Sequence, residues 1–489
     1  MNNTSEIESQ KLTLDPQDWS AMRSLGHQMI DDMMDYLQNI GNEPVWREIS
    51  TEAKQFLKEP IPQKATDIGK VYEEFKQYIL PYTKGNIHPR FFAWVEGTGT
   101  PFGVLAEMLA AAMNPNVTNG EHSAMYVDQQ VIEWCKQMMN YPATASGILL
   151  SGASMANITA LTVARNHQLG RNVRKEGLQT GVGQMVLYCS DETHICIQKA
   201  AEVLGLGTDS VRKISVDTSY RINIDELVKA IEKDLGDGFT PFCIVGNAGT
   251  VNTGAIDPLD ELFSICKKYH LWLHIDGAFG ALAKLLPKYA KQLEVIEVAD
   301  SVAFDLHKWM YMPYGVGCVL VKNAEAHRNA FAVTPKYLLQ EERGLAGGPD
   351  RINNFGIELS RGFKALKVWM SIKEHGIEKY ASVIGQNIAQ AFYLSDLIIR
   401  ESSLELLSPV TMNIVCYRFT IVGLSATELN ELNKEIVIQL QEQGIASPSS
   451  TILNGEYAIR ICIVNHRSQD ADFELLVKET IRIGRELGC

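Results

Sequence analysis

The sequence predicts an α/β fold with a mostly parallel central sheet, followed by a smaller C-terminal α+β domain. From about residue 86 to residue 370, short apolar runs of strand length alternate with helical segments, as in sheets that helices cover on both faces. The runs are residues 147–150, 185–189, 243–247, 271–276, 301–305 and 317–322. Two later runs, 412–419 and 457–464, stand between helices and indicate the smaller domain at residues 371–489.

Length and composition limit the classes of function. The chain has 489 residues, of which 46% are hydrophobic and 21% are charged, as expected for a packed protein of more than one domain. Its formal net charge is -13, whereas a nucleic-acid surface needs a basic stripe to neutralise phosphates. We therefore expect a small-molecule partner and no nucleic acid.

The lack of a recognisable targeting signal and the cysteine usage favour a cytoplasmic protein. Residues 1–19 lack the basic and apolar regions of a signal peptide, and no apolar run is long enough to cross a membrane. The nine cysteines form no CxxC pair, which argues against a zinc site or a disulfide framework. We expect reduced, mostly buried cysteines and no metal.

The N-terminal region, residues 1–85, is predicted to be a helical segment that packs on a partner subunit. A helix is expected from Asp15 to Ile40, because Asp15 can cap it, Pro16 suits its first position and Asp18 lies in its first turn. Its apolar residues recur at near-helical spacing, which is typical of a packing face. That face could contact the main domain or a second subunit.

The segment 151–157, SGASMAN, follows the predicted strand 147–150 and precedes a helical stretch. Free backbone N–H groups and the helix dipole make such a loop suitable for an anion. Small residues also occur in ordinary tight turns, and the segment matches neither a Walker loop nor a GxGxxG fingerprint.

Two further strand ends carry polar residues. Asp276 ends the run 271–276, where an α/β sheet opens its ligand crevice, and His307 and Lys308 follow the run 301–305. Asp276 could be a helix cap, and Lys308 could be a solvated surface group. Burial would lower the pKa of Lys308 and provide a neutral amine for Schiff-base formation. A phosphate loop, a carboxylate and a lysine in this order describe a pyridoxal phosphate site.

Six motifs extend this interpretation to a family. They are HPRFFAWVEGTGTP (88–101), SGASMANITAL (151–161), DETHICIQKA (191–200), GTVNTGAIDPL (249–259), HIDGAFG (274–280) and DLHKW (305–309). Together they resemble the group II pyridoxal-phosphate-dependent amino-acid decarboxylases, which include the aromatic-amino-acid, histidine and glutamate decarboxylases. The resemblance covers roughly residues 15–485. It implies fold type I, as in aspartate aminotransferase, with pyridoxal 5'-phosphate as cofactor and a homodimer whose active site forms at the subunit interface.

The resemblance also implies roles for the residues that bind the cofactor. Lys308 matches the lysine that forms the Schiff base, and Asp276 matches the carboxylate that pairs with the pyridine nitrogen. Ala153 and Ser154 match the phosphate-binding turn, and His307 matches a histidine that approaches the phosphate.

Five more residues match positions around the cofactor ring and the substrate. His194 matches a histidine that stacks on the ring, although it could instead be a hydrogen-bonded residue at a helix start. Thr250 matches a threonine near the phenolic oxygen, and Ala278 a small residue beneath the ring. Trp94 lies in the substrate-lining segment, and Arg460 matches an arginine that can meet the substrate carboxylate or form an ordinary ion pair.

The sequence departs from the family pattern at Asp305 and in the segment 344–359. Asp305 stands where many members have an asparagine, and a second negative charge near a phosphate is unfavourable unless it is paired. The segment 344–359 lacks the tyrosine that protonates the carbanion in aromatic-amino-acid decarboxylases, so His194, a residue of the partner subunit or water is the proton donor. In the substrate-lining segment, Glu96 could favour a cationic or polar substrate, or it could be solvated.

The implied activity is conversion of an L-amino acid to its amine and carbon dioxide through a Lys308 Schiff base and a quinonoid intermediate. Which amino acid is the substrate stays open. The missing tyrosine leaves oxidative deamination to an aldehyde as an alternative. A third possibility is a binding protein that has lost catalysis, but His194, Asp276, His307 and Lys308 are all present.

Overall fold

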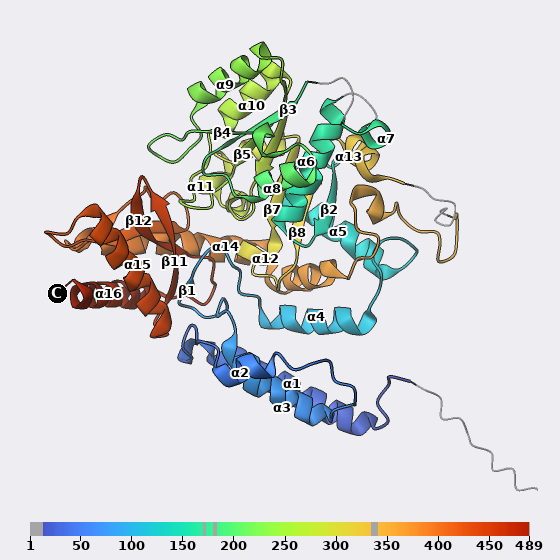
Figure 1. The fold of residues 1–489 in the computed structure, drawn as a ribbon. Helices are drawn as coiled ribbons and strands as arrows, with labels where there is room; N and C mark the ends of the chain where they lie inside the picture. The colour runs from blue at the N-terminus through green and yellow to red at the C-terminus, as the bar shows by residue number, and fades with distance from the viewer. Residues whose placement is uncertain (1–12, 170–172, 179–182, 334–340, 489) are drawn as a thin grey trace, which may run out of the picture. The chain divides into compact units, whose positions relative to one another are not determined.

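A computed structural model describes residues 13–169, 173–178, 183–333 and 341–488 (Figure 1). The described chain divides into two compact units. The first runs up to Glu43 and resumes at Glu48–Thr83, and the second comprises Pro44–Arg47 and the chain from Lys84 onward.

The first unit contains three helices, α1 (Trp19–Asn39), α2 (Thr51–Phe56) and α3 (Ile68–Tyr78). Helix α1 begins later than the sequence predicted, because the Asp18 carboxylate accepts hydrogen bonds from the backbone nitrogens of Ser20 and Ala21 at 2.8 and 3.0 Å. Asp18 is therefore the cap, and Asp15 precedes the helix. No residue of α1 is buried.

The main sheet of the second unit has seven strands in the order β2-β8-β7-β6-β5-β3-β4. They are β2 (Ser146–Leu150), β3 (Met185–Ser190), β4 (Val211–Ile214), β5 (Thr240–Asn247), β6 (Trp272–Asp276), β7 (Ser301–Asp305) and β8 (Gly317–Val321). Only β8 runs opposite to the others, as the mostly parallel prediction requires. Every residue of β3, β6, β7 and β8 is buried. Because alternate residues face opposite sides of a sheet, both faces are covered.

The helices of the second unit surround the main sheet and a smaller sheet (Figure 1). They are α4 (Pro101–Met113), α5 (Ser123–Met138), α6 (Ala153–Gln168), α7 (Val173–Glu176), α8 (Cys196–Val203), α9 (Ile224–Gly236), α10 (Leu259–Tyr269), α11 (Pro287–Ala290), α12 (Leu306–Trp309), α13 (Ala324–Phe331), α14 (Lys364–Arg400), α15 (Ala426–Glu442) and α16 (Asp470–Leu487). None of the described helices combines the length and the apolar character that crossing a bilayer needs.

The smaller sheet has the order β1-β11-β12-β10-β9 and is mostly antiparallel. Its strands are β1 (Phe91–Phe92), β9 (Leu404–Leu406), β10 (Ile414–Phe419), β11 (Ser447–Leu453) and β12 (Glu456–Cys462). Strand β1 pairs in parallel with β11, with Phe91 opposite Ser447. A segment expected in the large domain at 86–370 thus contributes a strand to the C-terminal sheet.

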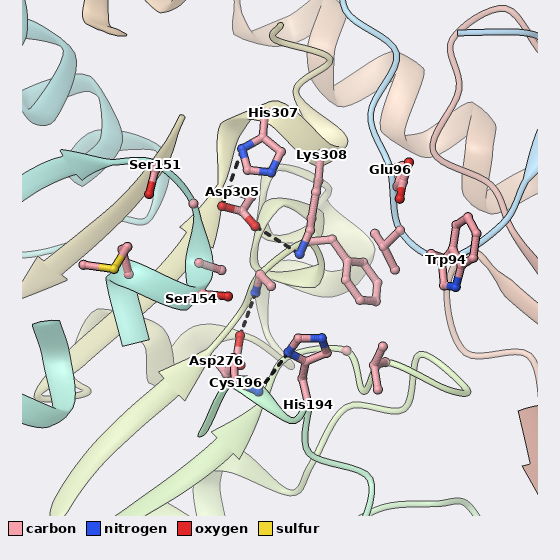
Figure 2. A pocket seen from close by; sticks show the side chains of 18 of the residues that line it. Trp94, Glu96, Ser151, Ser154, His194, Cys196, Asp276, Asp305, His307 and Lys308 are labelled. Atoms are coloured by element: carbon pink, nitrogen blue, oxygen red, sulfur yellow. Dashed lines mark hydrogen bonds and ion pairs between the residues drawn. The ribbon is translucent and has the colours of Figure 1, made fainter. Parts of the chain in front are cut away.

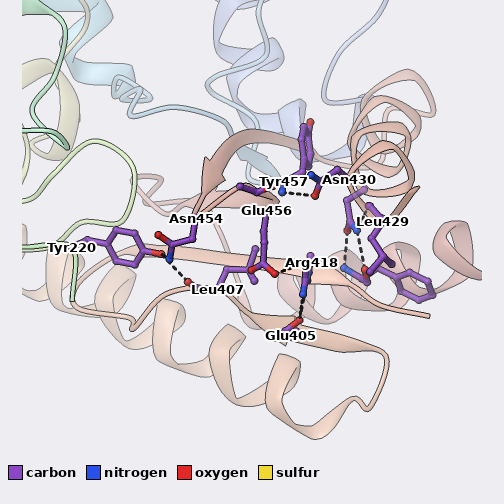
Figure 3. Close-up of polar contacts among 12 residues, drawn as sticks. Tyr220, Glu405, Leu407, Arg418, Leu429, Asn430, Asn454, Glu456 and Tyr457 are labelled. Carbon is purple, nitrogen blue, oxygen red and sulfur yellow. Dashed lines mark hydrogen bonds and ion pairs between the residues drawn. The ribbon is translucent and has the colours of Figure 1, made fainter. Parts of the chain in front are cut away.

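Polar contacts join this sheet to its surroundings (Figure 3). Asn454, in the turn between β11 and β12, donates to the Tyr220 hydroxyl at 3.1 Å, which links the turn to the loop before α9. On β10, Arg418 lies between Glu405 and Glu456, at 2.8 and 2.9 Å. These contacts connect neighbouring strands and hold the turn against the large domain.

Asn433 on α15 completes the hydrogen bonding at the end of β10. It is fully buried; its side chain accepts from the Phe419 nitrogen at 2.7 Å and donates to the Phe419 carbonyl oxygen at 2.8 Å. Asn430, one turn earlier, is only half-buried and bonds the Tyr457 nitrogen and the Gly455 oxygen (Figure 3).

We predict that Asn433→Ala lowers the free energy of unfolding by about 2–3 kcal/mol, because it leaves buried backbone groups of Phe419 without partners. Urea denaturation, combined with hydrogen exchange at the Phe419 amide, measures this change. Asn430→Ala is the matched control and should have a much smaller effect, since water can replace its bonds. Equal effects of the two substitutions would contradict the prediction.

Candidate active site

A cavity of about 560 Å³ lies where the carboxyl ends of β5, β6 and β7 meet. Parallel α/β sheets open their ligand crevices at this edge, and the volume suits a small-molecule site. Among the residues predicted from the sequence, those that line it are Trp94, Ala153, Ser154, His194, Asp276, Ala278, His307 and Lys308. Figure 2 shows how their side chains converge from several elements.

The sheet register explains why residues far apart in sequence converge here. Asn247 at the end of β5 pairs with Asp276 at the end of β6, and Asp276 pairs with Ala303 on β7. Asp305 ends β7 opposite Gly317, the first residue of β8. A Cβ atom at Gly317 would lie 2.5 Å from Asp305 Oδ1, so the Asp305 carboxylate occupies the space that glycine leaves.

Asp305 forms an ion pair with Lys308. The distance from Lys308 Nζ to Asp305 Oδ2 is 3.0 Å, and the side chain of Asp305 is almost completely buried. Burial alone would lower the pKa of Lys308, but attraction to Asp305 and Asp276 outweighs it, and the pKa is raised. This corrects the expectation that the pKa of Lys308 falls, because the carboxylate three residues earlier stabilises the ammonium.

His307 is buried behind Lys308. Its Nδ1 lies 2.9 Å from the Val316 carbonyl oxygen, and its ring contacts that of Tyr314 in a tilted arrangement with centroids 4.6 Å apart. Burial lowers the pKa of His307, so the ring is neutral near pH 7.

His194 lies in the loop between β3 and α8 and faces the cavity (Figure 2). Its Nδ1 accepts a hydrogen bond from the Cys196 nitrogen at 3.2 Å, as a histidine at a helix start would. The residue also lines the cavity, and its stacking on the cofactor ring stays a prediction. Desolvation lowers the pKa of His194. The neutral ring then carries its proton on Nε2, since Nδ1 is the acceptor.

Asp276 is buried at the end of β6. Its Oδ1 accepts from the Ala278 nitrogen at 3.1 Å, and its Oδ2 accepts from Asn157 Nδ2 at 3.0 Å. Its partners in these bonds are a side-chain amide and a backbone N–H group, both neutral donors. Asp276 thus differs from Asp305, whose partner is a cation.

The predicted phosphate turn is the first turn of a helix. Helix α6 begins at Ala153 after Gly152, earlier than expected, so Ala153 and Ser154 are its first two residues. First-turn N–H groups have no intrahelical acceptor and attract anions. A Cβ atom at Gly152 would lie 3.1 Å from His307 Cε1, so glycine keeps this corner of the cavity open.

These groups fit pyridoxal phosphate. Free N–H groups at the start of α6, the Asp276 carboxylate and the Lys308 amine line one cavity, as a phosphate, a protonated ring nitrogen and an aldehyde require. Asp305 Oδ1 is buried and has no hydrogen-bond partner. It lies 3.5 Å from where a Cβ of Gly152 would stand, next to the phosphate turn.

Two predicted residues do not reach the cavity wall. The Thr250 hydroxyl is buried, 3.1 Å from the Thr253 hydroxyl, and accepts from the Ala255 nitrogen at 3.0 Å. Arg460 donates to the backbone oxygens of Trp94, Val251 and Asn252, at 3.0, 2.6 and 3.0 Å. Arg460 therefore links the segment at Trp94 to the segment at residues 251–252 by hydrogen bonds.

The wall formed by residues 94–96 carries a compensated charge. Glu96 pairs with Lys84, whose ammonium also lies 4.3 Å from the centre of the Trp94 ring. Trp94 is 54% exposed. Glu96 is thus neither solvated alone nor available as an unpaired charge.

Sequence reasoning did not select several lining residues, namely Cys196, Asn247, Phe279 and Tyr314. Asn247 could have been found, since it ends an apolar strand run as Asp276 does. Phe279 and Cys196 lie inside motifs already singled out. Tyr314 is placed by the chain turn after α12, for which periodicity gives no signal.

Comparison with known proteins identifies the family. The family model described as the pyridoxal-dependent decarboxylase conserved domain matches residues 51–420. An aromatic-L-amino-acid decarboxylase of Bacillus atrophaeus is 35% identical over 451 residues, covering 91% of this chain and 92% of that protein. A phenylacetaldehyde synthase of Arabidopsis thaliana is 28% identical over 92% of this chain and 93% of that protein.

Solved structures share the fold. The crystal structure of Oryza sativa TDC with PLP and tryptamine has a TM-score of 0.89 and 22% identity, over 97% of this chain and 100% of that one. This chain therefore belongs to the pyridoxal-phosphate-dependent decarboxylases of fold type I, a family of carboxy-lyases that act on amino acids with pyridoxal phosphate as cofactor.

Proposed function

We propose that the chain decarboxylates an aromatic L-amino acid to its amine. The observation that carries this proposal is the lining of the cavity, to which Trp94, Phe279 and Tyr314 contribute aromatic rings. The acidic residue on the same wall, Glu96, is already paired with Lys84. An uncharged, flat side chain suits such a lining better than a charged one. The name of the Bacillus relative supports the same substrate class.

The site residues take the following proposed roles. Lys308 provides the amine that attaches the cofactor, and Asp276 holds a proton on the pyridine nitrogen. The first turn of α6 at Ala153 and Ser154, with His307 beside it, binds the phosphate. Bound pyridoxal phosphate supplies an electron sink for the bond that breaks between Cα and the carboxylate.

His194 is the proposed proton donor to Cα. Its Nε2 carries the proton while Nδ1 accepts from the Cys196 nitrogen, and it faces the cavity in Figure 2. The described residues 341–359 do not line the cavity, and segment 344–359 has no tyrosine. A group fixed in the wall is therefore a better candidate than a group on that segment.

The alternative product is an aldehyde. The missing tyrosine motivates this alternative, and a phenylacetaldehyde synthase of Arabidopsis thaliana is among the relatives of this chain. If no proton reaches Cα in time, oxygen can oxidise the carbanion, and the amine is replaced by aldehyde, ammonia and peroxide.

The test is to incubate cofactor-loaded protein with a panel of L-amino acids and to quantify carbon dioxide, amine and aldehyde. We expect aromatic substrates to give stoichiometric amine, and Lys308→Ala to lose the covalent cofactor absorption and at least about 10³-fold of the rate. Carbon dioxide with aldehyde and peroxide, but without amine, would favour the alternative. Turnover of charged amino acids alone would contradict the aromatic assignment.

The Asp305–Lys308 ion pair makes cofactor loading depend on pH. Attachment needs the neutral amine, and the raised pKa of Lys308 means that loading slows as the pH falls below that pKa. Asp305 also places negative charge beside the proposed phosphate turn.

We predict that Asp305→Asn loads pyridoxal phosphate about tenfold faster near pH 7, and that its pH profile shifts to lower pH. The substitution lowers the pKa of Lys308 and removes repulsion of the phosphate. Both effects make loading faster. Stopped-flow absorbance at several pH values measures loading. Glu96→Gln, at a lining carboxylate that pairs with Lys84 instead of Lys308, is the control. Slower loading of Asp305→Asn would show that Asp305 instead assists attachment.

The protein is further proposed to be a homodimer with active sites at the subunit interface. Helix α1 has no buried residue, and its apolar side chains Trp19, Met29 and Ile30 are exposed. An apolar helix face of this kind fits a second copy of the chain.

The double substitution Met29→Glu and Ile30→Glu should convert the dimer to a monomer, because burying unpaired charges in an apolar interface is energetically unfavourable. Light scattering coupled to gel filtration measures the mass, and activity should fall with the loss of dimer. Gln28→Glu, an exposed neighbour on the same helix, is the matched control. A dimer that persists in the double variant would contradict the assignment of α1 to the interface.

The proposed location is the cytoplasm. All eight described cysteines are free and buried, and reduced thiols persist in reducing compartments. Fractionation of the source cells tests this location.

A further inference from the structure

A chain of hydrogen bonds runs through the core behind Asp276 and ends on its carboxylate. Trp272 Nε1 donates to Ser301 Oγ at 2.8 Å, and Ser301 Oγ lies 2.9 Å from His274 Nδ1. His274 Nε2 lies 2.7 Å from Asn157 Oδ1, and Asn157 Nδ2 donates to Asp276 Oδ2 at 3.0 Å. The chain joins β6, β7 and α6.

The two ends of the chain fix the direction of every bond. The indole of Trp272 can only donate, so the Ser301 hydroxyl accepts from it. Because neutral His274 carries its proton on Nε2, its Nδ1 is the acceptor and takes the Ser301 hydroxyl proton. At the other end the amide nitrogen of Asn157 faces the carboxylate, so its oxygen accepts from His274 Nε2–H. A reversed amide would bring Asn157 Oδ1 against the Asp276 carboxylate. Hence every donor in the chain points toward Asp276.

Cys196 adds a branch to the same oxygen. The Asn157 amide also donates to Cys196 Sγ at 3.2 Å, and Cys196 Sγ lies 3.7 Å from Asp276 Oδ2. The thiol proton is thereby directed to the carboxylate. Asp276 Oδ2 has two neutral donors, and Oδ1 has the Ala278 nitrogen.

The chain is dry and carries no positive charge. His274, Asn157 and Ser301 are completely buried. Burial lowers the pKa of His274 to about 4, so it is neutral under ordinary conditions. The cationic or titratable groups that act on Asp276 from the cavity side are His194, Lys308 and the Cys196 thiol. No cation behind Asp276 among the described residues neutralises it, and its charge stays available on the cavity side.

We propose that Asn157 and His274 are positioning residues that set the protonation of the cofactor's pyridine nitrogen through Asp276. The inference rests on the proposed function, in which Asp276 faces that nitrogen. Neutral donors keep the carboxylate oriented, whereas a cation in their place would weaken its attraction for the ring proton. His274 acts by holding the Asn157 amide in the orientation that presents its nitrogen.

The test uses protein loaded with pyridoxal phosphate that carries ¹⁵N in the ring. The ¹⁵N chemical shift over a range of pH reports when the ring nitrogen loses its proton. In Asn157→Leu and His274→Phe we expect this loss at least about one pH unit lower than in the unmodified protein, a tenfold change in the equilibrium. His274→Gln, which can still donate to Asn157, should largely restore the unmodified titration.

His327→Gln is the matched control. His327 is also fully buried, burial lowers its pKa to about 4, and it bonds Ser146 Oγ and the Phe355 oxygen at 2.8 Å each, without a link to Asp276. It should leave the ring titration unchanged. Unchanged titration in both Asn157→Leu and His274→Phe would overturn the inference, as would equal shifts in His274→Phe and His274→Gln.

Failure of the proposed function is distinguishable. If the unmodified protein forms no covalent linkage to Lys308, the assignment of the site fails before the ring nitrogen is measured. If it forms the linkage and only the variants lack the expected shift, the positioning role fails alone. Should Asn157→Leu not fold, the two His274 variants carry the comparison.

Discussion

Two carboxylates buried at the ends of neighbouring strands are the constraint on which the rest of the site depends. An uncompensated buried charge costs several kcal/mol, and Asp276 and Asp305 are both almost fully buried. Asp305 is compensated by the Lys308 ammonium, and Asp276 by neutral donors. The charge of Asp305 is thus paired inside the protein, while the charge of Asp276 stays available to a ligand. Parallel β6 and β7 place these two different carboxylates beside the same cavity.

The cavity wall depends on long-range bracing by an arginine. Arg460 on β12 binds carbonyl oxygens of Trp94 and Val251, two lining residues from distant parts of the chain. Arginine suits this task because its planar fork donates in several fixed directions. The C-terminal lobe therefore shapes the site through backbone contacts. A substitution at Arg460 would disturb two walls at once, even though its side chain does not line the cavity.

Much of the architecture could be predicted from the sequence, because strands buried on both faces leave continuous apolar runs. The residues at the ends of β6 and β7 were found for the same reason. Strand β4 was missed because it lies at the sheet edge and carries Arg212 and Lys213. Strand β1 was missed because it has two residues, and its partner β11 lies far away in sequence.

Side-chain direction and charge balance were harder to predict. The raised pKa of Lys308 depends on Asp305, whose orientation follows from the space at Gly317. Motif matching predicted Thr250 and Arg460 near the ligand; in this structure neither lines the cavity, and their hydrogen bonds go to neighbouring residues. Spacing along a chain indicates which residues share an edge of a sheet, but only tertiary packing decides where each side chain points.

The pairing of β1 with β11 has a consequence for how the protein folds. Phe92 on β1 is completely buried, but its strand partner lies in the last tenth of the chain. During synthesis, the seven strands of the main sheet leave the ribosome long before β11. The apolar strand β1 therefore stays unpaired during that time and is exposed to aggregation or to chaperones. Residues 94–96 follow β1 directly. One wall of the cavity can therefore settle only when the ribosome has almost finished, and nascent or truncated chains would lack a complete site.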